Sequence, residues 1–276
     1  MAETFAGLVL AQPVVMGIIN VTPDSFSDGG EVFHPDQAIQ RGWDMVAGGA
    51  GILDIGGEST RPGANPVSID EEIRRVVPVI EALSDCGAVI SIDTRHSDVM
   101  VAAARAGAGI INDVTALTHD HRSVGVASEL GVPVILMHMQ GNPENMQAAP
   151  YYENAPVEVR DYLMSRVETC VNAGIARENI AVDPGIGFGK SLEHNLQILN
   201  RIELLGEIAG PVVLGVSRKS FIAKVCGEGD PHKRVPGSLA AAVLARQQGV
   251  QIFRVHDVEE TVQALSIADA IAGMNP

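Results

Sequence analysis

The chain is poor in cysteine and in basic residues, and each shortage excludes a class of protein. Its three cysteines, Cys86, Cys170 and Cys226, are widely spaced and form no C-x-x-C pair, so the sequence predicts neither a disulfide framework nor a structural zinc site. Only 19 residues are basic against 34 acidic ones, a formal net charge of −15. This charge argues against nucleic acid or an anionic membrane as a partner, and an anionic ligand would need a local basic cluster.

Long apolar runs are also missing. No segment reaches the roughly 18 consecutive apolar residues of a membrane-spanning helix, and residues 1–12 lack the basic start and apolar stretch of a secretory leader. Together with the cysteine usage, these features predict a protein of the reducing cytoplasm that does not enter a membrane.

Short β-branched and aliphatic runs, by contrast, recur along all 276 residues. Their hydrophobicity is nearly continuous, which is typical of parallel strands covered on both faces. We predict strands over these eight runs: Val14 to Ile19, Ile52 to Ile55, Val89 to Ile92, Gly109 to Ile111, Val134 to Met137, Ile180 to Val182, Val212 to Val216, and Ile252 to Val255.

Segments with helical spacing separate these runs. Two examples are Ile73, Val76, Ile80, Leu83 and Leu192, Leu196, Leu199, Ile202. Ser68 with Glu71, and Asp257 with Glu260, have the spacing of a helix cap and its partner, and Pro78 predicts a kink. Eight strand–helix units without a linker predict a single α/β domain over residues 1–276, a (β/α)8 TIM barrel in preference to a doubly wound sheet.

Three connections are long for such a fold and are therefore expected to be functional. They are Val21 to Pro35, Gly56 to Ser68, and Gly141 to Pro156. Polar residues also follow the strands one after another, and in a barrel these positions converge on one mouth. The polar residues are Asn20, Thr60, Arg61, Asp93, Asn112, Asp113, His138, Asp183, Lys219, Arg254 and His256.

The last predicted strand places Arg254 and His256 on the same side, because strand side chains alternate by two. An arginine beside an imidazole suits a phosphate or diphosphate, and the alternative is a structural ion pair of Arg254 with Asp257 or Glu259. The sequence Ser217-Arg218-Lys219-Ser220 adds a basic step at a possible helix start, where anions bind well.

Lys219 is one of only four lysines. A Schiff-base role is conceivable, but donation to a ligand carbonyl or carboxylate is simpler. Asp93 and Asp183 are expected to accept ligand N–H groups, and Asn112 can both donate and accept, so the set suits a flat, nitrogen-rich heterocycle. For Asp54 and Asp113 we expect helix capping instead.

The segment Gly185-Ile186-Gly187-Phe188-Gly189-Lys190 lacks the spacing of a phosphate loop, and we expect its glycines to allow close approach of a ligand. Six histidines show no metal-ligand spacing and are expected on the surface or at caps. They are His34, His96, His119, His121, His194 and His232.

Two segments, Met16 to Gly30 and Asp54 to Gly63, resemble the signatures of the dihydropteroate synthase family of pterin-binding enzymes. The resemblance continues in the family's order through segments that cover essentially the whole chain. These are Ser91 to Thr94, Ile111 to Val114, Met137 to Gly141, Asp183 to Lys190, Ser217 to Ser220, and Arg254 to Val258.

The resemblance implies a cytoplasmic transferase of folate biosynthesis that joins para-aminobenzoate to 6-hydroxymethyl-7,8-dihydropterin diphosphate, giving 7,8-dihydropteroate and diphosphate. Carried over residue by residue, it assigns three groups of binding residues. Asp93, Asn112, Asp183, Lys219, Met137 and Phe188 would hold the pterin. Asn20, Arg254, His256 and Thr60 would bind the diphosphate, with Asn20 also holding Mg²⁺. Phe26, Thr60, Arg61, Pro62, Phe188, Lys219 and Ser220 would contact para-aminobenzoate.

Lys219, Arg254, His256 and Asp93 are then the expected catalytic residues. We favour a dissociative displacement assisted by Mg²⁺, with the first two long loops as lids that exclude water. The alternatives are a pterin-dependent methyltransferase and a pterin-binding paralogue without turnover. Arg95 departs from the family pattern, as do Asn142 and Glu144, without touching the predicted chemistry. Apolar helix positions from Ser238 to Ala245 suggest a homodimer.

Overall fold

The computed structural model describes residues 4–22, 35–59, 67–141 and 146–273 of the chain. Within these ranges, eight parallel strands form one sheet in the order β8-β7-β6-β5-β4-β3-β10-β9, which confirms the predicted barrel. The strands are β3 (Val14–Asn20), β4 (Ile52–Gly56), β5 (Val89–Asp93), β6 (Ile110–Asp113), β7 (Val134–Met137), β8 (Ile180–Asp183), β9 (Val213–Leu214) and β10 (Ile252–Val255).

The barrel closes at a seam between β8 and β9. This seam consists of an isolated parallel bridge between Val182 and Val212 and of two backbone hydrogen bonds, Gly210 N to Ile180 O at 2.9 Å and Val182 N to Pro211 O at 3.1 Å. The strand predicted over Val212 to Val216 is therefore shorter in the structure. β10 pairs with it only at two positions, and the chain then leaves the sheet toward the next helix.

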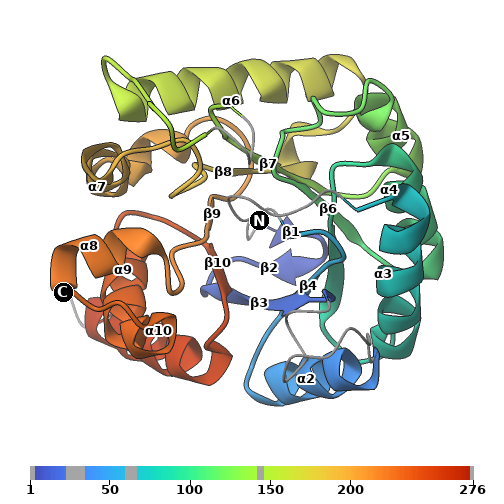
Figure 1. Cartoon of the computed structure of the whole chain (residues 1–276), viewed down its shortest axis with the longest axis horizontal. Helices are drawn as coiled ribbons and strands as arrows, with labels where there is room; N and C mark the ends of the chain where they lie inside the picture. Colours follow the sequence, from blue (N-terminus) through green and yellow to red (C-terminus); the bar gives the residue numbers. More distant parts are fainter. Residues whose placement is uncertain (1–3, 23–34, 60–66, 142–145, 274–276) are drawn as a thin grey trace.

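Helices form a ring around the strands (Figure 1). Their bounds are α2 (Pro35–Ala47), α3 (Ile69–Leu83), α4 (Ser97–Ala106), α5 (Ser123–Leu130), α6 (Ala155–Asn172), α7 (Leu192–Asn200), α8 (Ser220–Cys226), α9 (Val235–Gln247) and α10 (Val258–Ala272), with short 3₁₀ turns η1 (Arg177–Asn179), η2 (Ile202–Leu205) and η3 (Pro231–Arg234). None of the helices in the described ranges combines the length and apolar character that crossing a bilayer requires.

The main core lies between the sheet and this ring, because every second strand residue points outward and is apolar. In α3, Val76, Ile80 and Leu83 are buried as predicted, and Ser68 Oγ accepts the N–H of Glu71 at 3.3 Å, which confirms the predicted cap. The face predicted for α7 is confirmed except at one position: Ile202 is buried and Leu192 and Leu199 pack against the core, whereas Leu196 is 42% exposed. Ser191 and His194 form a reciprocal cap that sets the helix so that Asn195 and Ile198 face inward.

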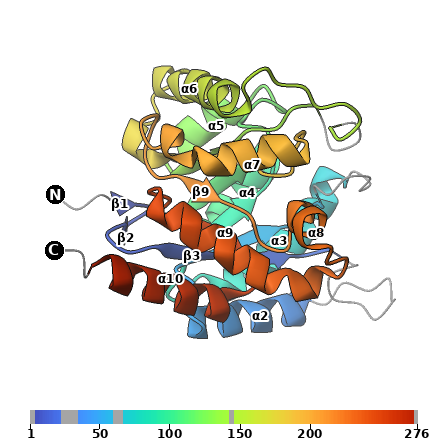
Figure 2. The same ribbon diagram turned by 90° about the vertical axis from the view of Figure 1, so that its left-hand side faces the viewer.

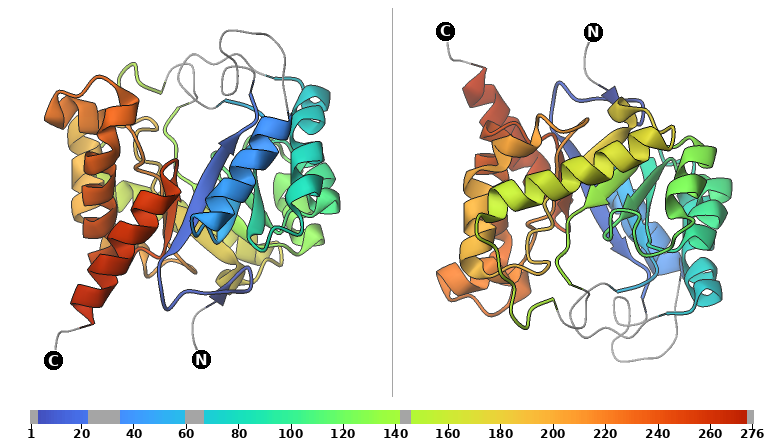
Figure 3. Two further views of the ribbon diagram at one scale, coloured as in Figure 1. Left: turned by 90° about the horizontal axis from the view of Figure 1, so that it is seen from below. Right: turned by 90° about the horizontal axis from the view of Figure 1, so that it is seen from above.

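A smaller core fills the barrel at the amino ends of the strands. An antiparallel hairpin of β1 (Thr4–Phe5) and β2 (Leu8–Val9) precedes the barrel. It lies at the same end of the barrel as the last turn of α10 (Figures 2 and 3). Phe5 and Leu10 pack on inward residues of the strands, so this end is plugged. The strand residues are Met16, Ile52, Ile110, Ile135, Ala181, Val213 and Ile252.

Candidate active site

The inward-facing residues at the amino ends of the strands are apolar. Two residues further along several strands, toward the carboxyl ends, the inward-facing residues are polar. Arg254 on β10 donates from Nε to Asp54 Oδ2 at 2.6 Å and from Nη2 to Asp93 Oδ2 at 2.7 Å. Asp54 also accepts from Ser91 Oγ at 2.6 Å and from Asn112 Nδ2 at 3.1 Å. These five residues, here called the Asp54 cluster, join predicted pterin ligands to a predicted diphosphate ligand.

The Asp54 cluster corrects two predictions. Asp54 does not cap a helix. It lies two residues after the inward-facing Ile52, so its carboxylate points into the barrel and is fully buried. Arg254 does form an ion pair, but its partners are Asp54 and Asp93 and not Asp257 or Glu259. Burial raises the pKa of Asp93, and the guanidinium of Arg254 limits that rise.

Asp113 is also fully buried, but it faces away from the barrel interior. Its carboxylate accepts from the N–H and the Oγ1 of Thr115, at 2.7 and 2.6 Å. It therefore holds a turn and not a helix, because α5 begins only at Ser123. Burial raises the pKa of Asp113 to about 6.

Asp183 and Lys219 lie on opposite sides of the barrel seam. Asp183 ends β8, and its Oδ1 accepts the N–H of Gly185 at 2.7 Å. Lys219 precedes α8, and its Nζ donates to Ile186 O and lies 4.9 Å from the centre of the Phe188 ring. Burial lowers the pKa of Lys219 to about 8, although the carboxylate of Asp183 opposes this shift. The amine is a donor next to an aromatic wall.

The orientation of the His256 ring is set by Ser217. Ser217 Oγ accepts the backbone N–H of His256 at 3.1 Å and lies 3.0 Å from His256 Nδ1. Because the hydroxyl already accepts one bond, its own hydrogen can be donated to Nδ1, which leaves the ring proton on Nε2. Burial lowers the pKa of His256 to about 3, helped by Arg254. The ring is therefore a neutral N–H donor at neutral pH.

The residues of the basic segment that precedes α8, Ser217 to Ser220, lie in different surroundings. Arg218, which has a positive φ of 58°, donates from Nε to Asp257 Oδ2 at 3.0 Å. Asp257 therefore binds Arg218 and makes no side-chain cap bond to α10, so the predicted pairing with Glu260 is wrong. Arg218 is therefore held by Asp257, whereas Ser220 is exposed at the first position of α8.

The glycines of residues 185–189 allow close approach of another part of the chain. A Cβ atom on Gly185 would lie 1.9 Å from His138 O, and one on Gly189 would lie 2.3 Å from Gln140 O. Both glycines have positive φ values. They make room for the backbone that follows β7. The sequence had predicted that they make room for a ligand.

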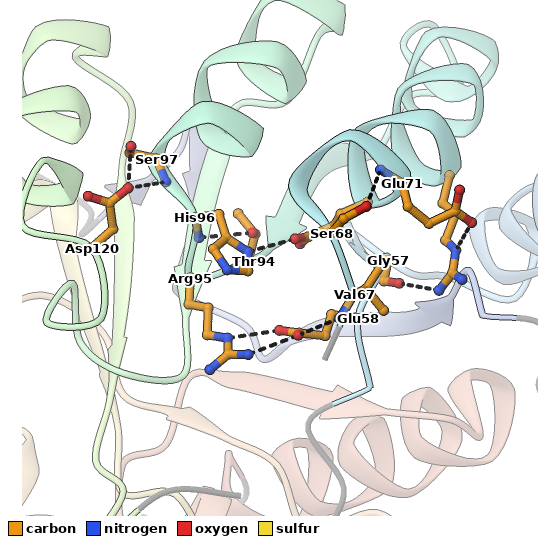
Figure 4. A network of polar contacts seen from close by, with 12 residues as sticks. Gly57, Glu58, Val67, Ser68, Glu71, Thr94, Arg95, His96, Ser97 and Asp120 are labelled. Carbon is orange, nitrogen blue, oxygen red and sulfur yellow. Dashed lines mark hydrogen bonds and ion pairs between the residues drawn. The ribbon is translucent and has the colours of Figure 1, made fainter. Parts of the chain in front are cut away.

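A second polar network lies where β4 and β5 end (Figure 4). Arg95 donates to both carboxylate oxygens of Glu58, from Nε at 2.8 Å and Nη2 at 2.9 Å. Glu58 Oε1 also accepts the N–H of Val67 at 3.3 Å, and the carboxylate of Glu72 pairs with His96 Nδ1 at 2.8 Å. Arg95, predicted to lie apart from the chemistry, thus contacts a signature segment. His96 occupies the N-cap position of α4, but its side chain binds Glu72 and makes no cap hydrogen bond.

The remaining predicted residues are placed as follows. Asn20 ends β3 and is half-buried, and Met137 ends β7 and is buried. Phe26, Thr60, Arg61 and Pro62 lie outside the described residues, as do most of the first two long connections and His34, Asn142 and Glu144. In the described ranges, no group of three or more His, Cys, Asp and Glu side chains could hold a metal ion.

Comparisons with known proteins agree with this geometry. Residues 16–256 match the family described as pterin binding enzyme. The chain is 48% identical over 264 residues to dihydropteroate synthase of Escherichia coli strain K12, which covers 95% of this chain and 93% of that protein.

Solved structures match as well. Dihydropteroate synthase of Xanthomonas albilineans with 4-aminobenzoic acid has a TM-score of 0.93 at 44% identity over 100% of both chains. The enzyme of the same organism in complex with 7,8-dihydropteroate has a TM-score of 0.88 at 43% identity over 97% of both. The family match spans the barrel from β3 to His256, and the relatives cover nearly the full length, so this chain belongs to the dihydropteroate synthase family of pterin binding enzymes.

Proposed function

We propose that this chain joins para-aminobenzoate to 6-hydroxymethyl-7,8-dihydropterin diphosphate, with the two halves of the pterin substrate bound by two connected sets of residues at the barrel mouth. The Asp54 cluster carries this proposal, because it links the pterin ligands Asp93 and Asn112 to the diphosphate ligand Arg254. Such a connection suits a substrate that has a heterocycle at one end and an anion at the other.

The pterin ring would lie between Asp93, Asn112 and Asp183, whose side chains accept and donate hydrogen bonds in one mouth. Lys219 supplies an N–H donor to the ring from the far side of the seam, and Met137 and Phe188 supply apolar contact. Since Asp93 binds Arg254 before substrate arrives, pterin binding would replace one hydrogen bond of the guanidinium and leave its bond to Asp54 in place.

The diphosphate would bind Arg254 and His256. Arg254 retains its charge at any working pH, and His256 donates from Nε2 as a neutral ring, so both favour the charge that grows on the leaving group. Thr60 is a further predicted ligand outside the described residues.

The residues at this end of β3 fit a magnesium ion. Asn20 ends the strand as a half-buried residue with a side-chain amide oxygen, and Mg²⁺ typically takes only one or two protein oxygens together with substrate phosphates. Asn20 would hold the ion, which when bound offsets negative charge on the diphosphate. Chelation with EDTA followed by return of Mg²⁺ should abolish and restore activity, and Asn20→Ala should raise the Mg²⁺ concentration that half-saturates the enzyme.

Para-aminobenzoate would approach from the side of Phe188 and Ser220, with Phe26, Thr60, Arg61 and Pro62 as predicted contacts outside the described residues. An aniline is already nucleophilic, and the residues around the mouth serve mainly to bind and orient. We therefore propose that the C–O bond to the diphosphate breaks before the new C–N bond forms, with the electron-rich pterin stabilising a cationic methylene.

The reaction is tested by diphosphate release from purified protein with Mg²⁺, pterin diphosphate and para-aminobenzoate, each omitted in turn. Release should require both substrates, yield dihydropteroate and collapse in Lys219→Ala. Tight pterin binding without release would indicate a paralogue without turnover, and methyl transfer to a corrinoid would indicate the methyltransferase.

The order of bond breaking is tested separately with pterin diphosphate labelled by ¹⁸O at the bridging oxygen. If a cation forms, the label should move to non-bridging positions on enzyme lacking para-aminobenzoate. Absence of scrambling, with turnover normal when para-aminobenzoate is added, would favour direct displacement.

We also propose a homodimer that forms through α9 and its neighbour α10. Leu244 on α9 is 60% exposed, and Ile267 and Ile271 on α10 are 60% and 68% exposed, so an apolar face remains on this pair of helices. Light scattering should give twice the mass of one chain, and Leu244→Glu should give the monomer mass.

We expect the protein in the cytoplasm. Cys226 is an exposed free thiol, and Cys86 and Cys170 are free and buried, which suits a reducing compartment. Fractionation of cells that express a tagged chain, with periplasmic and membrane markers, would test this.

A further inference from the structure

The segment from residue 185 to residue 190 is held by side chains along its whole length, although it is neither helix nor strand. Each of its first five carbonyl groups accepts a side-chain hydrogen bond. The donors are Lys190 to Gly185 O, Lys219 to Ile186 O, Gln147 to Gly187 O, Lys190 to Phe188 O and Tyr152 to Gly189 O. With three glycines at positive φ, this backbone has wide conformational freedom, so these donors determine its shape.

Lys190 is the donor that acts twice. Its side chain is 2% exposed, and its Nζ lies 3.0 Å from Gly185 O, 2.9 Å from Phe188 O and 2.9 Å from His138 Nδ1. His138 O, at 3.3 Å, is a further acceptor for this amine, so the group is surrounded by backbone carbonyls and one ring nitrogen. Within the described ranges, no carboxylate lies at ion-pair distance from this buried amine. Burying an amine without a carboxylate partner is destabilising, and the hydrogen bonds that it makes to this segment offset that cost.

The two carbonyls that Lys190 binds belong to Gly185 and Phe188. They lie next to the two groups of this segment that contact Lys219. Ile186 O lies directly after Gly185 and accepts from Lys219. The Phe188 ring, on the other held residue, lies 4.9 Å from the amine of Lys219. Lys190 is itself buried behind the segment and does not line the mouth.

We infer that Lys190 is a positioning residue for the substrate pocket: it fixes the backbone of residues 185–189 and through it the Phe188 wall and the Lys219 amine. This inference rests on the proposed function, because it takes Phe188 and Lys219 as substrate contacts. It assigns no contact between Lys190 and substrate.

The test is steady-state kinetics of Lys190→Met, which keeps the length of the side chain and removes its three donors. The Michaelis constant for para-aminobenzoate should rise at least about tenfold, the loss expected when a positioned contact is misplaced. The inhibition constant of free inorganic diphosphate should stay within about twofold, because Arg254 is held by Asp54 on β4 and His256 by Ser217 between β9 and α8, outside the segment that Lys190 holds. A merely structural lysine would lower the concentration of folded enzyme, so the maximal rate would fall while both constants stayed normal.

Arg177→Met is the matched control. Arg177 also donates to a backbone carbonyl, Ile208 O at 2.8 Å, but it lies before β8, at the opposite end of the strand that leads to Lys190. This variant should leave both constants unchanged.

If Lys190→Met does not fold, Tyr152→Phe provides a milder change. It removes only the hydroxyl that binds Gly189 O at 2.9 Å and should raise the same Michaelis constant by a few-fold. A normal constant in each of these variants that folds would overturn the inference. An inactive wild-type chain would instead overturn the proposed function, so the two failures can be told apart.

Discussion

Replacing Asp54 with alanine should destabilise the barrel strongly, because three buried donors lose one acceptor. Ser91 and Asn112 each lose a bond worth about 1 kcal/mol, and Arg254 loses one to a charged partner worth about 2–3 kcal/mol. The sum is about 4–5 kcal/mol, which agrees with the roughly 3–5 kcal/mol measured when one partner of a buried ion pair is removed.

The assay is urea unfolding followed by circular dichroism, with the slope compared between variants to check that the same transition is measured. Asp54→Asn can keep its oxygen toward Arg254 and donate its amide to Ser91, so it should lose only about 1–2 kcal/mol. Asp113→Ala is the matched control, since Asp113 is equally buried and its carboxylate accepts the N–H and the Oγ1 of Thr115, and it should lose about 2 kcal/mol. An Asp54→Ala loss no greater than that of Asp113→Ala would refute the accounting.

Three further outcomes are expected. Burial lowers the pKa of Lys219 to about 8, below its unfolded value of 10.5. The pH profile of kcat/KM should therefore fall above pH 8, and the free energy of unfolding should rise between pH 8 and 10.5, where only the unfolded chain keeps the proton. A fall in kcat/KM at the same pH in Lys219→Arg would exclude this lysine as its cause. Gly189→Ala puts a Cβ 2.3 Å from a carbonyl oxygen at a φ of +63° and should cost about 3 kcal/mol or more in urea unfolding, whereas Gly227→Ala, with φ +73° and open space, should cost only about 1–2 kcal/mol. Phe5→Ala empties the plug and should cost about 3–5 kcal/mol, and an unchanged melting temperature would show that the hairpin does not stabilise the barrel.

The sequence was sufficient for the barrel and for the positions of most candidate site residues. Apolar runs of three to six residues mark buried parallel strands, and four of the eight strands of the barrel end on a polar residue. Because parallel strands share one direction, Asp93, Asn112 and Asp183 had to meet at one mouth. That inference needs only chain order.

The partners of these residues needed the closed barrel. Asp54 and Arg254 are 200 residues apart, and their contact depends on the register of every strand between them. The same applies to Glu58 and Arg95, whose contact depends on how β4 and β5 are aligned. Strand alternation from Ile52 gave the one available signal that Asp54 points inward.

Local signals failed where tertiary contacts overrode them. The hairpin of β1 and β2 has two residues in each strand, too few to show a period. Asp257 has the spacing of a cap, but a nearby guanidinium holds its carboxylate. The glycines before Lys190 make room for the chain after β7, which no local pattern reveals.

The thin seam between β8 and β9 has a dynamic consequence. A region with few interstrand hydrogen bonds is where local opening costs least, so the amides of Val182 and Gly210 should exchange with solvent earlier than those of β4. Asp183 and Lys219 lie on either side of that seam, and a ligand that binds both would have to hold it shut. Substrate should therefore slow amide exchange at these two positions more than anywhere else in the sheet.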